Sequence, residues 1–144
     1  MQRADQRWWN KPLVNYQGKI LPAELVVLSI ELKPEEDGRW MNSRGTTSGV
    51  VDYIVKQSKT VRKILPDNVS AVLKKLYEAS GLSKGCPDLV IWSTTSDKMR
   101  FVEVKCPHWD RPSAEQDKFM SSAQRHGIVT TIVEWEFTDH PLHQ

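Results

Sequence analysis

The sequence predicts an α/β fold, on two observations: its length and a change of hydrophobic period along the chain. The 144 residues fit one domain, 1–144, large enough to bury a core without disulfides. Apolar residues recur at helical spacing between residues 48 and 81 and fall into strand-like runs after residue 85. We therefore expect a single domain built from both helices and strands.

Composition excludes several classes of protein. Hydrophobic residues make up 39% and charged residues 26% of the chain, as in ordinary soluble domains. No apolar run approaches the ~20 residues needed to span a bilayer, and the polar N-terminus lacks the apolar centre of a signal peptide. Two cysteines are too few for a disulfide framework. We expect an intracellular protein of the cytoplasm or nucleus, without a membrane partner.

The N-terminal third gives the least regular pattern. Residues 1–19 are polar with scattered aromatic residues and predict an irregular, peripheral arm. Residues 20–33 are apolar and rich in β-branched residues, and large apolar side chains alternate over residues 26–32, which favours a strand. Pro22 followed by Glu24 could also open a helix. Residues 34–40 predict a turn followed by a short returning strand.

Two helices are predicted next. Residues 48–65 have apolar side chains at helical spacing, and Pro66 would end this helix. Asp67 can cap a second helix, which Gly81 would close.

Basic residues gather in these two predicted helices. Six of them lie within twenty residues against a single acidic residue, a local excess of five positive charges. This asymmetry suggests a polyanionic partner, although the solvated outer faces of two helices would give the same pattern. Three of the lysines share one helical face and are the expected contacts: Lys56, Lys59 and Lys63.

The C-terminal half predicts strand, strand, helix and strand. Residues 88–92 and 99–105 are apolar runs joined by a polar turn over residues 93–98. A helix is expected from Ser113, since Gln116 three residues on completes a capping-box pattern, and a last strand over residues 128–137.

The strand over residues 99–105 contains two opposite charges, Glu103 and Lys105. Alternation places both side chains on one face. A turn centred on residue 96 would set Asp88 opposite Val104 and beside Glu103, and a shift of one residue would set it directly opposite Glu103. A surface ion pair would explain Glu103 and Lys105, but not the nearby Asp88.

Two carboxylates this close repel unless a cation holds them. Mg²⁺ takes oxygen ligands, often one or two carboxylates with water and phosphate. The ammonium of Lys105 could then stabilise charge that develops on a phosphate. Metal-dependent hydrolysis of phosphodiesters explains all three groups: Asp88, Glu103 and Lys105.

These residues resemble the PD-(D/E)XK nuclease signature, here Pro87-Asp88 followed by Glu103-Val104-Lys105. Over residues 81–137 the chain resembles the VRR-NUC subfamily, which includes standalone phage and bacterial nucleases and the C-terminal domain of the Fanconi-associated nuclease. The matching residues are Gly85-Cys86-Pro87-Asp88-Leu89-Val90-Ile91-Trp92, Phe101-Val102-Glu103-Val104-Lys105, Asp110-Arg111, Gln116 and Gly127.

The resemblance implies a DNA endonuclease dependent on Mg²⁺ or Mn²⁺, with a restriction-endonuclease-like α/β core in which helices flank a mixed central sheet. It makes Asp88 and Glu103 metal ligands, with the carbonyl of Val104 as a further ligand. It makes Lys105 the catalytic lysine, and gives Gln116 a supporting or phosphate-contacting role. A further acidic residue usually comes from an early helix, and the candidates here are Glu24, Glu31, Asp52 and Glu78.

The sequence departs from the family pattern after the catalytic lysine. Cys106 stands where the family usually has glycine, and residues 107–112 contain a tryptophan and a second proline. Cys86 and Cys106, with His108, could suggest a zinc site, but reduced, packed thiols explain the cysteines better.

Substrate and assembly follow from the resemblance. We expect branched DNA, either a Holliday junction or a flap, in DNA repair; a catalytically inactive DNA-binding module on the same fold is the alternative. Standalone relatives indicate a homodimer, with Trp8 and Trp9 or residues 20–33 as its apolar surface. A phage or virus is among the sources such relatives suggest.

Overall fold

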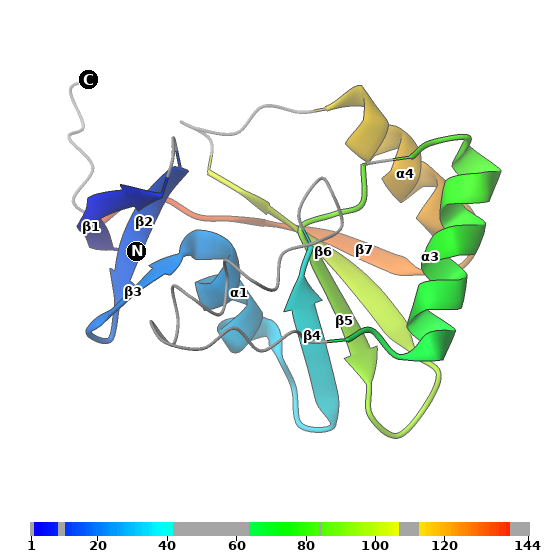
Figure 1. The fold of residues 1–144 in the computed structure, drawn as a ribbon, viewed down its shortest axis with the longest axis horizontal. Helices are drawn as coiled ribbons and strands as arrows, with labels where there is room; N and C mark the ends of the chain where they lie inside the picture. The colour runs from blue at the N-terminus through cyan, green and yellow to red at the C-terminus, as the bar shows by residue number, and fades with distance from the viewer. Residues whose placement is uncertain (1, 9–10, 42–63, 84, 107–112, 139–144) are drawn as a thin grey trace.

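The described residues of the computed structural model, drawn as a ribbon in Figure 1, are 2–8, 11–41, 64–83, 85–106 and 113–138. The helix predicted over residues 48–65 lies outside them except at Ile64 and Leu65, which are not helical.

A four-stranded sheet forms the centre of the fold. In spatial order it contains β4 (Glu36–Trp40), β5 (Leu89–Ser93), β6 (Met99–Lys105) and β7 (Val129–Glu134). The first three strands are antiparallel neighbours, whereas β7 runs parallel to β6 and is reached through helix α4 (Ala114–Arg125). The predicted mixed sheet and the predicted strand, strand, helix, strand order are confirmed.

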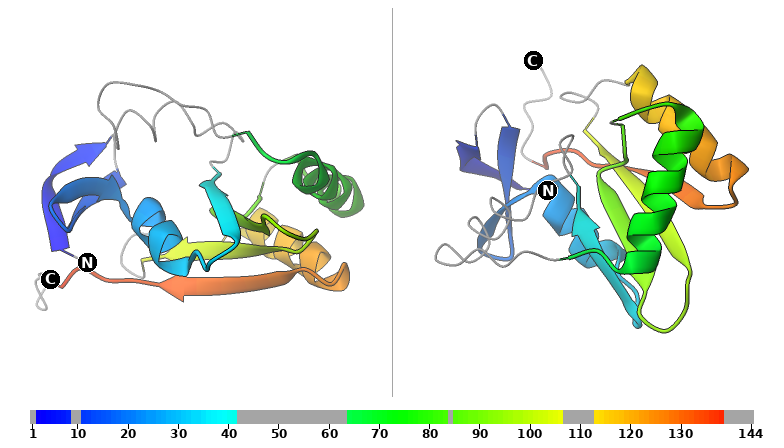
Figure 2. Two further views of the ribbon diagram at one scale, coloured as in Figure 1. Left: turned by 90° about the horizontal axis from the view of Figure 1, so that it is seen from below. Right: turned by 45° about the vertical axis from the view of Figure 1, so that its right-hand side comes forward.

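Helices cover both faces of this sheet. Along β5, Leu89 and Ile91 pack on the side of helix α1 (Ala23–Glu31), and Val90 and Trp92 pack on the side of helix α3 (Asp67–Ser80) and α4. Because successive side chains of a strand point to opposite faces, β5 supplies both cores. Figure 2 shows α3 and α4 side by side, away from the N-terminal strands.

The register between β5 and β6 decides which charged groups meet. Leu89 pairs with Val102, where the register predicted from a turn centred on residue 96 would pair Leu89 with Glu103. That prediction is wrong by one residue, because the turn closes between Ser93 and Lys98, joined by a bond of 2.9 Å. Continuing the observed register brings Asp88 level with Glu103.

The N-terminal residues form a separate antiparallel sheet of three strands. Its members are β1 (Gln2–Trp8), β2 (Lys11–Tyr16) and β3 (Lys19–Pro22), so the prediction of an irregular arm is wrong. Gln17 and Gly18, both with positive φ, make the two-residue turn between β2 and β3.

Helix α1 replaces most of the strand favoured over residues 20–33. Pro22 is its N-cap residue, so the alternative of a helix opened at Pro22 is the one observed. Val26 packs towards β2, whereas Val27 and Leu28 pack towards the central sheet. A helix buried between two sheets has apolar residues on two sides, which hides its helical period.

Helix α3 ends as predicted but begins one residue differently. Gly81 closes it in a left-handed conformation with φ of 71°. Pro66 is the N-cap residue, so Asp67 is the first helical residue instead of the cap. None of the helices that the structure describes is long and apolar enough to cross a membrane.

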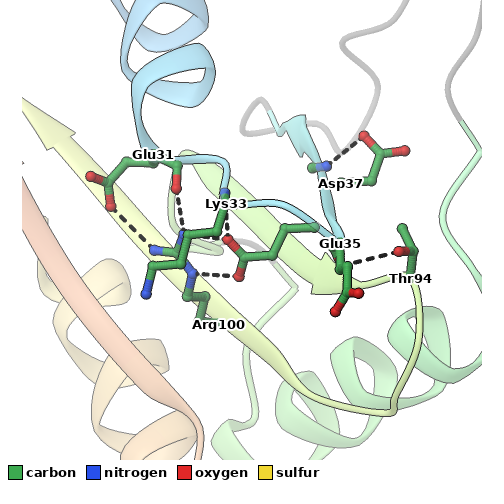
Figure 3. A network of polar contacts seen from close by, with 8 residues as sticks. Glu31, Lys33, Glu35, Asp37, Thr94 and Arg100 are labelled. Atoms are coloured by element: carbon green, nitrogen blue, oxygen red, sulfur yellow. Dashed lines mark hydrogen bonds and ion pairs between the residues drawn. The ribbon is translucent and has the colours of Figure 1, made fainter.

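A polar network joins the end of α1 to β4 and β6 (Figure 3). The Arg100 guanidinium donates to both carboxylate oxygens of Glu36, at 3.1 and 2.9 Å, and to the carbonyl oxygen of Glu31 at 2.8 Å. It also donates to the Glu31 carboxylate at 3.2 Å. The bond to Arg100 is the largest cause that lowers the pKa of Glu36. This network lies at the opposite end of β6 from Glu103.

We predict that Arg100→Met lowers the free energy of unfolding by about 2–3 kcal/mol, because two carboxylates lose their cation. Since the pKa of Glu36 is lowered in the folded state, its contribution is present above the unfolded pKa and lost as pH falls through the folded value. Chemical denaturation at pH 7 and pH 3 measures both effects. The exposed neighbour Lys98 supplies the control, Lys98→Met; an equal loss in both variants would contradict the prediction.

Candidate active site

Strand β6 places Glu103 and Lys105 on one face and Val102 and Val104 on the other. Val102 and Val104 are buried on the α1 side, while Phe101 packs against the α3 and α4 side. Glu103 and Lys105 share the face of Phe101, as the alternation predicts. Glu103 is 2% exposed, and the Lys105 side chain is 20% exposed. The site thus has a buried carboxylate with an accessible ammonium beside it.

Asp88 lies in the bend just before β5 and is held at two atoms. Its Oδ2 accepts a hydrogen bond from the amide of Val104 at 2.9 Å. Its carbonyl oxygen accepts one from the amide of Met41, after β4, at 2.6 Å. The carboxylate therefore lies against β6, next to the residue that follows Glu103.

The carbonyl of Val104 faces the same edge of β6 as Asp88. In a strand, the amide and carbonyl of one residue point to the same side, and the Val104 amide points to Asp88. The carbonyl of Lys105 points the other way and accepts from the amide of Trp135 at 2.9 Å. The backbone thus offers a carbonyl oxygen on the side of the Asp88 carboxylate.

Gln116, in the first turn of α4, joins Glu103 to Lys105. Its Nε2 donates to Oε1 of Glu103 at 3.3 Å, and its Oε1 accepts from Nζ of Lys105 at 3.2 Å. Nζ of Lys105 lies 3.8 Å from Oε1 of Glu103. The amide bridge fixes the lysine beside the acid.

Ser113 caps α4 and so places Gln116. The Ser113 hydroxyl accepts from the amide of Gln116 at 3.3 Å, which is half of the predicted capping box. The Gln116 side chain turns to the site instead of back to the cap. The positive end of the α4 dipole lies on the same side as Glu103 and Lys105.

Cys86 borders the acidic pair as a neutral group. Burial, and then the nearby charges of Glu103 and Asp88, raise the pKa of the Cys86 thiol, which is hydrogen-bonded to Tyr77. Burial also raises the pKa of Tyr77, to about 12. Cys86 is half-buried and Cys106 is buried, and the two do not form a disulfide with each other.

The donor set fits a hard divalent cation. Asp88 and Glu103 supply carboxylate oxygens and Val104 a carbonyl oxygen, which are the ligand types that Mg²⁺ and Mn²⁺ prefer. Within the described residues, no group of three or more His, Cys, Asp and Glu side chains could hold a metal ion. Water and a phosphate oxygen of the substrate would have to complete the coordination.

The structure separates the four candidates for the additional acidic residue. Glu31 is bound to Arg100, and Glu78 is exposed on α3. Glu24 is buried in the first turn of α1. Ala23 of the same turn packs with Phe137, which follows β7, so this end of α1 lies towards the Lys105 end of β6. Asp52 lies outside the described residues.

Other expected site residues fall where the structure gives no description. They are Trp9 of the expected dimer surface, the three lysines expected to contact DNA, and the segment after β6. The lysines are Lys56, Lys59 and Lys63, and the segment is residues 107–112, which includes His108, Asp110 and Arg111. Two residues that border the site, Tyr77 and Gly85, have no predicted role. A glycine three residues before Asp88 is the feature of the sequence that could have indicated a role for position 85.

Parts of the chain are similar to known proteins in sequence and in fold. A 48-residue stretch is 42% identical to Fanconi-associated nuclease 1 of Danio rerio, covering 33% of this chain and 5% of that protein. The structure of paFAN1 bound to a 2-nucleotide 5′-flap DNA with a gap superposes with a TM-score of 0.54 at 14% identity. That match covers 81% of this chain and 35% of the other, and it supports the fold.

A protein-family model matches the part of the chain that contains β4, the β5–β6 hairpin and α4. The model of the VRR-NUC domain family matches residues 30–134, most of the chain and all four central strands. The chain therefore belongs to the VRR-NUC domain family.

Proposed function

We propose that this VRR-NUC domain is an endodeoxyribonuclease that hydrolyses phosphodiester bonds with Mg²⁺ or Mn²⁺. The observation that carries the proposal is the placement of Lys105. Its ammonium lies 3.8 Å from the buried Glu103 carboxylate, fixed there by Gln116, while Asp88 is held on the adjacent edge of β6. A DNA-binding module without activity has no need for two carboxylates and a lysine in this arrangement.

Each side chain has a separate task in this proposal. Asp88, Glu103 and the Val104 carbonyl would hold the metal ion, which supplies charge neutralisation and a more acidic bound water. Lys105 donates hydrogen bonds to a non-bridging oxygen of the scissile phosphate, whose negative charge grows as water attacks phosphorus. Gln116 keeps the Lys105 ammonium and the Glu103 carboxylate apart at a fixed separation. We assign the role of the additional acid to Glu24, because its end of α1 lies towards the Lys105 end of β6.

Branched DNA is the substrate we propose. Support comes from the related paFAN1, solved with a 5′-flap DNA, and from the basic residues Lys56, Lys59 and Lys63 of this chain. DNA as substrate also implies an intracellular location and a role in repair or recombination.

Cleavage assays on matched substrates test the proposal. A Holliday junction, a 5′ flap and linear duplexes of the same sequence would be incubated with Mg²⁺, with Mn²⁺, and with EDTA. We expect metal-dependent cleavage, faster on at least one branched substrate than on the linear duplex. Binding to every substrate without cleavage under any metal condition would favour the inactive binding module.

We also propose a homodimer, since one compact site cuts one strand and symmetric cleavage of a junction requires two. Of the expected surface over residues 20–33, Val26, Val27 and Leu28 are buried in the monomer, whereas Ile30 is exposed. Among the described strands, β7 is at the edge of the central sheet and exposes Val129 by 60% and Ile132 by 57%. An exposed apolar edge strand favours pairing with a second chain.

Ile132→Asp is predicted to shift the chain from dimer to monomer at micromolar concentration, since it places a charge on the edge surface. Sedimentation velocity measures the shift. Ile30→Asp is the matched control, because Ile30 is 59% exposed on α1. A wild-type monomer, or equal sedimentation of both variants and the wild type, would contradict the proposed interface.

A further inference from the structure

Gly85 lies three residues before Asp88, in the loop that leads from α3 into β5. Its φ is +111°, a conformation that residues with side chains rarely adopt. A Cβ atom at this position would lie 2.8 Å from the carbonyl oxygen and 2.9 Å from the carbonyl carbon of Glu115. Both are backbone atoms of α4, so no side-chain rotation could relieve the contact.

This contact joins the two halves of the candidate site. Residue 115 precedes Gln116, which bridges Glu103 and Lys105. On the other side, Asp88 is fixed by the amides of Val104 and Met41. Pro87, between Gly85 and Asp88, is buried, so the short loop has little freedom to absorb a displacement.

We propose that Gly85 is a positioning residue for the metal site, an inference that rests on the proposed function. Because Gly85 has no side chain, the loop that carries Asp88 packs directly against the first turn of α4. The same contact therefore sets the place of the Asp88 carboxylate and of the amide that holds Glu103 and Lys105. Gly85 itself touches neither substrate nor metal.

The test compares Gly85→Ala with Gly81→Ala and Gly127→Ala. The control glycines have φ of +71° and +77°, but a Cβ atom at either would meet nothing within 4 Å. All three variants place alanine at positive φ, and only Gly85→Ala adds the backbone clash. Melting temperature, affinity for Mn²⁺ alone by calorimetry, and kcat and KM on the best substrate would be measured for each.

We expect Gly85→Ala to weaken Mn²⁺ binding by about tenfold or more and to lower kcat by about 10–100-fold, with little change in KM. The controls should lose melting temperature but keep the wild-type Mn²⁺ affinity and kcat. Equal Mn²⁺ affinity in Gly85→Ala and the controls would overturn the inference. A wild-type protein that neither binds Mn²⁺ nor cleaves DNA would instead overturn the proposed function.

A second pair of variants applies if Gly85→Ala does not fold. Ser113→Ala weakens the first turn of α4, and Gln116→Ala removes the bridge to Glu103 and Lys105. In the Gln116→Ala background, Ser113→Ala should still lower Mn²⁺ affinity several-fold, since the turn also supports the Asp88 loop through Gly85. Gln124→Ala, near the far end of α4, is the control in that background. No further loss from Ser113→Ala would overturn the inference.

Discussion

Asp88→Asn and Glu103→Gln are each expected to lower metal-dependent cleavage by about 10³-fold or more, because each removes a charge from a proposed metal ligand at nearly constant volume. Both variants should fold, and without metal each should be as stable as the wild type or more stable, since a repulsion between carboxylates is relieved. Single-turnover cleavage and thermal melting without divalent ions measure the two effects.

Two exposed acids provide matched controls for these variants. Asp97, in the turn between β5 and β6, and Glu78, on α3, carry the same groups away from the site. Asp97→Asn and Glu78→Gln should cleave at the wild-type rate. Unchanged cleavage in both Asp88→Asn and Glu103→Gln would contradict the site assignment.

Lys105→Ala is expected to lower the rate of the chemical step by about 10²–10³-fold while changing DNA affinity little. In the proposed mechanism the lysine acts on one phosphate in the transition state, whereas affinity is spread over many phosphate contacts. Single-turnover rates at saturating enzyme, together with Kd measured in Ca²⁺, separate the two quantities.

Lys98→Ala is the control for this loss of charge. Lys98 is exposed at the opposite end of the hairpin from Lys105. Both variants should show similar small changes in Kd, and only Lys105→Ala should have a lower single-turnover rate of cleavage. A Lys105→Ala protein that binds DNA poorly but keeps its single-turnover rate would show a groove contact instead of a catalytic group.

Local patterns in the sequence were enough to predict the hairpin of β5 and β6. Strand β6 occupies residues 99–105 as predicted, because its apolar residues lie between a polar turn and Pro107. Ser113 likewise begins α4 as predicted. The residue types Asp88, Glu103 and Lys105 could be singled out because charges in a buried strand require a reason.

The register and the amide bridge depend on longer-range contacts. The loop closes at Ser93 and Lys98, and a one-residue change there decides whether Asp88 comes level with Val104 or Glu103. Nothing in the spacing of Gln116 shows that its side chain would leave the helix cap for Glu103 and Lys105.

The N-terminal elements could not be predicted from local pattern alone. Strand β2 gains its burial from tertiary contacts, since Val14 packs against α1 and Phe137. The β-branched residues of α1 favoured a strand, but burial between two sheets outweighs that preference. A short polar strand such as β1 is defined by its pairing with β2. That pairing cannot be read from the residues of β1 alone.

The central claim is that Asp88, Glu103 and the Val104 carbonyl hold one divalent ion. A crystal of the protein soaked in Mn²⁺ and measured near the manganese absorption edge tests it directly. The proposal predicts an anomalous peak between the Asp88 and Glu103 carboxylates, within coordination distance of their oxygens, that is absent in Asp88→Asn. Manganese bound only elsewhere, in a protein that cleaves DNA with Mn²⁺, would contradict it.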